Sequence, residues 1–115
     1  MEVLVTKSIE KELYKILSSQ KSIDFFINKL KKKNIENIYI KRPFVKIKVS
    51  VFWLALRIIG EYRKVEWRLV LILIVKKADK TYWSNLTWSK EIEHKVISIL
   101  PKLSQDIKNL HYKIY

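Results

Sequence analysis

Five residues whose side chains could bind or act on a phosphate group lie in the second half of the sequence: Arg57, Lys76, Lys77, Lys80 and Tyr82. Guanidinium and ammonium groups donate strong hydrogen bonds to phosphate oxygens. A phenol can transfer a proton, and its ring can stack on a nucleobase. Four of the five follow directly after a long apolar run, so the end of one strand would bring them to one place. We expect the functional site there.

The apolar run before these residues extends from Leu69 to Val75 and contains only Leu, Ile and Val. It is too short to cross a bilayer, which takes about 20 residues. A run of this length and composition is typical of a β-strand that is buried on both faces. We therefore predict that residues 69–75 form the central strand of the fold.

Two further strands are predicted before the central one. The alternation in residues 44–49 predicts a packed apolar face and a wet, basic face. The apolar face would hold Val45, Ile47 and Val49, and the basic face Lys46 and Lys48. Residues 51–59 are predicted to form a strand buried on both faces apart from Arg57. Because burying a lone guanidinium is costly, Arg57 should pair with a carboxylate or face a cleft.

The remaining segments are predicted from turn and capping signals. Gly60 and Glu61 should form a turn, and residues 62–67 the next hairpin arm, while Pro43 should lie at a strand edge or between strands. Residues 2–6 should form a short first strand.

Three amphipathic helices are expected. Two cover residues 8–17 and 22–30, capped by Ser8 and Ser22, and a third begins after Ser89 and is kinked or restarted at Pro101. Lysines 31–33 would either neutralise the end of the second helix or bind phosphate, with Asn34 as the terminator.

The four tryptophans divide into two pairs. Trp53 and Trp67 lie in predicted strands and are expected in the core, where their N–H groups would find partners. Trp83 and Trp88 lie in a polar segment close to the lysines. For this second pair, packing in the core is as good an interpretation as recognition, whether by stacking on a base or by docking against a partner.

Composition limits the classes of protein. The 115 residues suit a single domain spanning 1–115, and the absence of Cys excludes disulfides and thiolate metal sites. His94 and His111 have no standard zinc spacing, so we expect neither a metal nor a cofactor. The first residues lack the features of a signal peptide, which predicts a cytoplasmic protein that does not enter membranes.

Charge is the strongest compositional signal. The chain carries 24 Lys and Arg against 11 Asp and Glu, a net charge of +13. Such an excess favours a polyanionic partner, either a phosphate-bearing molecule or an acidic protein. Solubilisation, or a compositional bias towards Lys and Ile, would produce the same charge without a partner.

The predicted order of strand, helix, helix, three-strand meander and helix in a small basic chain resembles the RelE/HigB/ParE superfamily of type II toxin-antitoxin toxins. The resemblance is most specific where an arginine-bearing strand precedes an apolar strand that runs into lysines, and where a loop then leads to a helix opening with Glu-Ile. These parts are Leu56-Arg57-Ile58, the stretch from Leu71 to Thr81, Asn85-Leu86-Thr87 and Lys90-Glu91-Ile92. The resemblance to the superfamily covers the chain to about residue 100.

The resemblance implies an α+β fold in which two N-terminal helices pack on a twisted antiparallel meander of three to four strands, with a C-terminal helix. It also implies a metal-independent mRNA endonuclease, usually ribosome-dependent, that inhibits translation and is neutralised by a cognate acidic antitoxin. Arg57 with Lys76 or Lys77 would stabilise charge on the phosphate, and Lys80 or Tyr82 would protonate the leaving oxygen or stack on a base. The residues expected to bind RNA are Lys46, Lys48, Arg63, Trp83 and Trp88.

Two other classes of function fit the same sequence. The chain could be a nucleic-acid or ribosome-binding module without catalysis, or a gyrase-directed or degenerate ParE-like toxin whose basic groove only holds an acidic partner. The general base is also open, because the nearest imidazole, His94, is expected on a helix surface.

Overall fold

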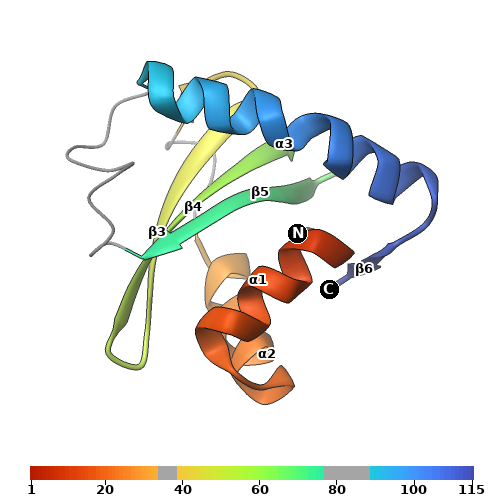
Figure 1. Cartoon of the computed structure of the whole chain (residues 1–115). Helices are drawn as coiled ribbons and strands as arrows, with labels where there is room; N and C mark the ends of the chain where they lie inside the picture. Colours follow the sequence, from red (N-terminus) through yellow and green to blue (C-terminus); the bar gives the residue numbers. More distant parts are fainter. Residues whose placement is uncertain (34–38, 77–88) are drawn as a thin grey trace.

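A computed structural model describes residues 1–33, 39–76 and 89–115. The protein is an α+β domain in which a curved sheet lies between helices (Figure 1). The described elements, in chain order, are β1 (Glu2–Thr6), α1 (Lys7–Leu17), α2 (Gln20–Lys31), β2 (Tyr39–Lys41), β3 (Phe44–Val51), β4 (Leu54–Arg63), β5 (Arg68–Lys76), α3 (Lys90–Lys108) and β6 (Tyr112–Ile114).

The strands form one mixed sheet in the order β2-β3-β4-β5-β1-β6. Strands β2 to β5 make the predicted antiparallel meander, with Pro43 between β2 and β3. Beyond β5 the sheet continues with β1, which runs parallel to β5, and with β6, which runs antiparallel to β1. The sheet is therefore wider than the predicted three to four strands, because both chain ends contribute short strands whose partners lie far away in the sequence.

Strand β5 is the centre of the sheet, as predicted from its apolar run. Every residue from Leu69 to Val75 is at most 8% exposed. The strand is buried on both faces because helices cover both sides: α1 and α2 pack on one face, and α3 crosses the other (Figure 1). No helix in the described ranges is long and apolar enough to span a membrane.

A separate apolar core lies on each face of the sheet. The core beneath α1 and α2 includes Phe26, Ile58 and Leu71, and the core beneath α3 includes Ile59, Val70 and Ile92. Alternate residues of β4 and β5 thus face different helices, as the two-residue period of a strand requires.

A β-bulge interrupts this alternation in β5. Ile59 pairs with Leu73, but the next residue, Gly60, pairs with Leu71, so Ile72 is the extra residue. As a result, Ile72 and Leu73 are consecutive yet both belong to the core beneath α3. A bulge bends its strand and increases the local twist. It therefore changes the direction of β5 midway along its length.

The helices agree with the predicted amphipathic segments, but their caps differ. The side chain of Thr6, rather than Ser8, accepts a hydrogen bond from the backbone N–H of Ile9, and Ser19, rather than Ser22, caps α2. Ser8 is instead inside α1, where its hydroxyl donates to Asp106 at 2.8 Å. Ser89 caps α3 as predicted.

Other helix predictions have mixed outcomes. Helix α3 continues through Pro101 to Lys108, where the sequence indicated a kink or a restart. Asn34, the expected terminator of α2, lies outside the described residues.

Two turns were misplaced by the sequence pattern. Residues 51–59 do not form one strand, because Phe52 and Trp53 make the tight turn between β3 and β4. Gly60 lies inside β4, and the next turn is at residues 64–67. Trp53 and Trp67, predicted in the core, are in these two turns and are 93% and 62% exposed. Apolar and aromatic turn residues gave no Gly, Pro or Asn signal by which a turn could be recognised.

Candidate nucleic-acid interface

Three cationic residues come together on the sheet face that also carries α3. Lys48 of β3 lies directly opposite Arg57 of β4, and Lys46 lies opposite Ile59, which belongs to the core beneath α3. Because the side chains at alternate positions share a face, Lys46, Lys48 and Arg57 all project from this face. We call these three residues the basic cluster. Two of them were predicted to bind RNA and one to be catalytic.

The members of the basic cluster differ in burial. Lys48 is exposed, Arg57 is half-buried, and Lys46 is only 7% exposed, so the predicted wet face is wet at Lys48 but not at Lys46. The alternation revealed the face correctly but could not reveal that part of it is covered. Burial, the largest cause, and the positive charges of Lys48 and Arg57 together lower the pKa of Lys46 to about 8.

Arg57 has no ion pair with a carboxylate among the described residues, and its guanidinium donates to the carbonyl of Leu56 at 3.2 Å. Glu61 and Glu66 pair with Arg63, at 3.3 and 3.7 Å. Of the two alternatives posed by the sequence, the described part of the structure therefore does not support a carboxylate partner. The guanidinium keeps donors that an anion can use.

Arg63 is not part of the basic cluster. It follows Arg57 by six residues on β4, a distance of about 20 Å along an extended strand. It also has the two carboxylate partners described above, which compete with phosphate for its guanidinium. The structure thus places this predicted RNA-binding residue at the opposite end of β4.

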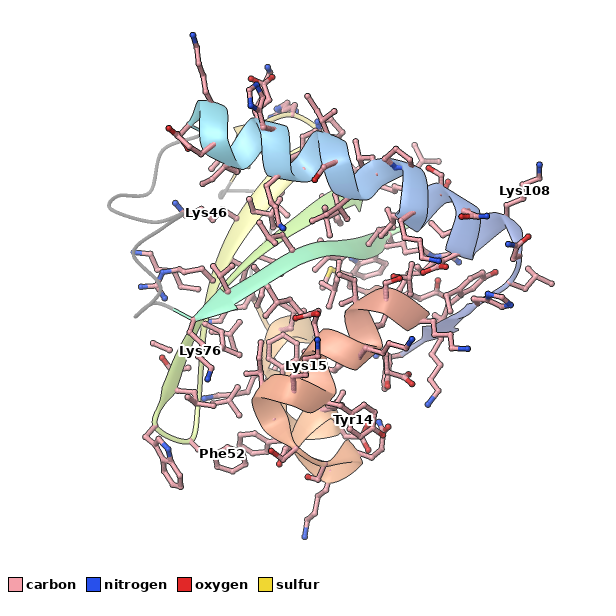
Figure 2. The ribbon with its side chains drawn as sticks, in the orientation of Figure 1. Tyr14, Lys15, Lys46, Phe52, Lys76 and Lys108 are labelled. Carbon is pink, nitrogen blue, oxygen red and sulfur yellow. The ribbon has the colours of Figure 1, made fainter. Side chains whose placement is uncertain are left out.

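Lys76 lies on the other face of the sheet. It pairs with Leu56, and its face is that of Ile74 and Leu56, both in the core beneath α1 and α2. Figure 2 shows Lys46 on the side of α3 and Lys76 on the side of α1. The expected convergence of Arg57 with Lys76 is therefore absent, since neighbouring positions on paired strands alternate between faces. Lys77, Lys80, Tyr82, Trp83 and Trp88 lie outside the described residues.

The sequence also gave no indication of an aromatic surface at the tip of the β3–β4 hairpin. Phe52 stacks on Phe25 of α2, with ring centroids 5.5 Å apart, and lies 6.3 Å from the ring of Trp53. All three rings are substantially exposed, Phe25 at 48% and Phe52 at 59%. Phe52 has φ 57°, a left-handed conformation that a bulky residue rarely adopts. Exact hairpin register would have been needed to find this surface from sequence.

The described residues contain no group of three His, Asp or Glu side chains that could hold a metal ion. The basic cluster offers two lysine ammonium groups, of which Lys46 has the lowered pKa, and one guanidinium. No family model, curated protein or solved structure matches this chain.

Proposed function

We propose that this chain is a toxin of the RelE/HigB type: an endoribonuclease that cuts mRNA on the ribosome and whose basic cluster acts on the scissile phosphate. The observation that carries the proposal is the position of Lys46, Lys48 and Arg57 together on one face of the β3–β4 hairpin. The order of strand, two helices, meander and helix supports it, as does the net charge of +13.

RNA cleavage needs a base but no metal. The 2′-hydroxyl loses its proton and attacks the adjacent phosphorus, the bond to the 5′-oxygen breaks, and a 2′,3′-cyclic phosphate and a 5′-hydroxyl remain. Lys46 is the proposed base: a pKa of about 8 leaves part of its amine neutral near physiological pH, and its Nζ, which is buried in the free chain, must become accessible when RNA binds. An unperturbed lysine would be almost fully protonated there.

The other two members of the basic cluster would stabilise charge. Lys48 and Arg57 face each other across β3 and β4, so both can donate to the non-bridging oxygens of one phosphate. The leaving 5′-oxygen needs a proton, for which Lys80 and Tyr82 remain the predicted donors. An acidic antitoxin segment that covers the basic cluster would block the same oxygen-binding groups.

The proposal is tested by controlled expression and by cleavage on translating ribosomes. Wild-type protein should arrest growth and yield mRNA fragments with cyclic phosphate ends. Lys48→Ala and Arg57→Ala should each reduce cleavage by a factor on the order of hundreds, the scale for loss of one preorganised donor. Lys11→Ala removes an exposed positive charge from α1 and should cleave normally.

A binding module without catalysis is the second candidate, and the exposed rings of Phe25, Phe52 and Trp53 favour it. Aromatic rings beside cations bind single-stranded nucleic acid by stacking, without chemistry. In that case the wild-type chain would bind ribosomes or RNA and leave the RNA intact. A ParE-like chain would instead inhibit gyrase supercoiling and leave mRNA uncut, so the same preparations distinguish all three functions.

A further inference from the structure

In the part of the chain that the structure describes, one edge of the central strand has no paired strand from Leu71 to Lys76. Strand β1 pairs with β5 only at Arg68, Leu69 and Val70. After Thr6 the chain enters α1 and leaves the sheet, while β5 continues to Lys76. The bulge at Ile72 coincides with this separation, because it redirects β5 just after the last pair. Among the described residues, no strand pairs with the β1-side edge of β5 beyond Val70.

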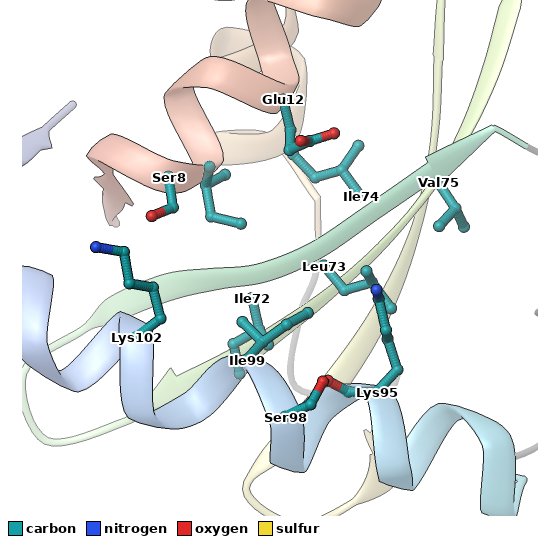
Figure 3. A pocket seen from close by; sticks show the side chains of 11 residues that line it. Ser8, Glu12, Ile72, Leu73, Ile74, Val75, Lys95, Ser98, Ile99 and Lys102 are labelled. Carbon is teal, nitrogen blue, oxygen red and sulfur yellow. The ribbon is translucent and has the colours of Figure 1, made fainter.

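This edge forms the floor of a groove between α1 and α3 (Figure 3). The groove has a volume of about 450 Å³, and its floor is residues 72–75 of β5. One wall is α1 and the other α3, so the side chains that line it come from both faces of the sheet. The wall residues central to the inference are Ser8, Ile9, Glu12, Lys95, Ser98 and Lys102.

An open edge of this kind is unusual in the middle of a sheet. It presents N–H and C=O groups at the spacing of a β-ladder, and most buried backbone groups in proteins are paired. Proteins usually protect exposed edges with charges, proline or very short strands. Here the edge carries four apolar residues, of which Ile72 is fully buried and Leu73, Ile74 and Val75 are each 7–8% exposed as whole residues. The edge is therefore suited to accept another strand.

We propose that the edge of β5 beyond Val70 is a docking site for an extended, acidic segment of a partner protein, which adds to the sheet as a further strand. Such a segment would extend the ladder of β5 where β1 leaves it, over about five or six residues. The site does not depend on the nuclease chemistry, and β4 and β5 separate it from Lys48 on β3.

The walls of the groove specify the chemistry of the segment. Alternate side chains of an added strand would point towards α1 and towards α3. Ile9 and Ile74 offer apolar contacts on the first side, and Ile99 and Leu73 on the second. The segment should therefore carry apolar residues, as a strand in a two-layer core does.

Charge favours an acidic segment over a neutral one. Lys95 and Lys102 line the α3 wall and Glu12 the α1 wall. Glu12 has an ion pair with Lys15 at 3.3 Å and Lys102 has one with Asp106 at 3.5 Å, so among the described residues Lys95 is the wall cation without a carboxylate partner. A chain with a net charge of +13 would also attract an acidic segment from a distance. Nucleic acid fits this groove less well, because none of the described residues that line it is aromatic and nucleotides do not match the donor and acceptor spacing of a strand edge.

The probe for this site is a phage-displayed library of random 12-residue peptides, selected against the full chain. We expect enrichment of peptides with alternating apolar residues interspersed with Asp and Glu. A selected peptide should slow hydrogen exchange of amides in residues 71–76. Methylating its backbone nitrogens one at a time should reduce affinity at least tenfold at alternate positions only, since only alternate N–H groups of an added strand face β5.

Two tryptophan variants on α3 provide the matched pair. Ser98 is exposed and lines the groove, so Ser98→Trp should fill it and reduce peptide affinity at least tenfold. Ile97 is 57% exposed and does not line the groove, so Ile97→Trp should bind as the wild type does. Lys48→Ala should leave peptide binding unchanged even if it abolishes RNA cleavage, which separates this site from the proposed function.

Several results would overturn the inference. One is selection without an enriched pattern, and another is peptide binding that Ser98→Trp leaves intact or that all backbone methylations weaken alike. Protection of residues 71–76 by a uridine 12-mer in place of the peptide would assign the groove to nucleic acid. A concentration-dependent dimer in sedimentation, lost in Ser98→Trp, would assign it to a second copy of the chain.

Discussion

Lys48 of β3 and Arg57 of β4 are direct cross-strand neighbours, so two positive side chains occupy one pair position of the sheet. Like charges in this position destabilise a sheet, whereas opposite charges stabilise it by roughly 0.2–1 kcal/mol. The pair is therefore unfavourable for folding in the absence of an anion. A phosphate between the two side chains would reverse the sign of their interaction.

Replacing Lys48 by Glu should raise the stability of the fold and remove its ability to bind phosphate. The new carboxylate would pair with Arg57, and we expect the free energy of unfolding to rise by up to about 1 kcal/mol. Urea denaturation at low salt measures this change, and added salt should diminish it. Lys11→Glu on α1 is the control for net charge. Lower stability of Lys48→Glu, or undiminished RNA binding, would contradict the role given to this pair.

Lys46 should make stability depend on alkaline pH. Its pKa is about 8 in the folded chain and 10.5 in the unfolded chain, so the unfolded chain binds more protons between these values. The free energy of unfolding should then rise as the pH increases from 8 to 10.5, because the buried amine no longer has to lose its proton on folding. Below pH 8 the folded chain bears the full free-energy cost of burying the charged amine of Lys46.

The variant Lys46→Met isolates this effect from the other groups that titrate in the same range. It keeps the apolar stem, and its stability should rise less between pH 8 and 10.5 than that of the wild type. Phosphate or RNA bound at the basic cluster should raise the pKa of Lys46, which an NMR titration of its Nζ would detect. Equal pH profiles for the two proteins would show that Lys46 is not perturbed.

The sequence identified the elements better than their connections. Residues 69–75 were correctly predicted to be central because an uninterrupted apolar run has one common explanation in a small domain, a strand buried on both faces. The alternation around Ile47 also assigned the two faces of β3 correctly. The pairing of β1 with β5 was not predictable, since it joins Leu4 to Val70 and depends on the whole topology.

The candidate site was predicted in part. Lys46, Lys48 and Arg57 were selected by residue type. Grouping Arg57 with Lys76 assumed that all side chains near one end of a strand pair lie on the same face of the sheet, which they do not. The pairing register of two strands decides which side chains lie opposite each other. In the β3–β4 hairpin the register depends on the turn at Phe52 and Trp53, which was not recognised. Without that turn, the direct pairing of Lys48 with Arg57 could not be inferred.

Asp106 should cause part of the loss of stability in acid. This carboxylate is 3% exposed and accepts hydrogen bonds from the hydroxyl of Ser8 at 2.8 Å and from its backbone N–H at 3.4 Å. Burial by itself would raise its pKa, but the bonds from Ser8 and the charge of Lys102 outweigh burial, and the pKa is lowered from 3.8. The contribution of Asp106 to the free energy of unfolding is therefore present above pH 3.8, and it disappears as the pH falls through the lower pKa of the folded chain.

Replacing Ser8 by Ala removes the shorter of these bonds and leaves the backbone donor in place. Hydrogen bonds to charged groups contribute about 1.5–3 kcal/mol, so Ser8→Ala should reduce stability at pH 7 by that order. The difference from wild type should become smaller towards pH 2. Ser104→Ala, at an exposed position of α3, is the control. A difference that stays constant with pH would mean that Ser8 acts by packing alone.

Gly60, the single glycine of the chain, is required where β4 approaches β5 at the bulge. A Cβ atom at this position would lie 2.6 Å from Cδ1 of Leu69 and 3.0 Å from the backbone oxygen of Val70. Gly60→Ala should therefore overpack the core beneath α1 and α2 and reduce the free energy of unfolding by about 1–3 kcal/mol. Ser50→Ala, at an exposed position of β3, should change it little.

A double-mutant cycle distinguishes this close approach from a general preference for glycine. Leu69→Ala alone should cost about 2–5 kcal/mol, because it leaves a cavity in the core. In the double variant the methyl group at position 60 can enter the space that Leu69 vacates, so the combined loss should be smaller than the sum of the two by about 0.5–3 kcal/mol. The contact with the Val70 oxygen remains and should prevent full recovery. Strictly additive losses in urea denaturation would mean that Leu69 does not set the requirement for glycine.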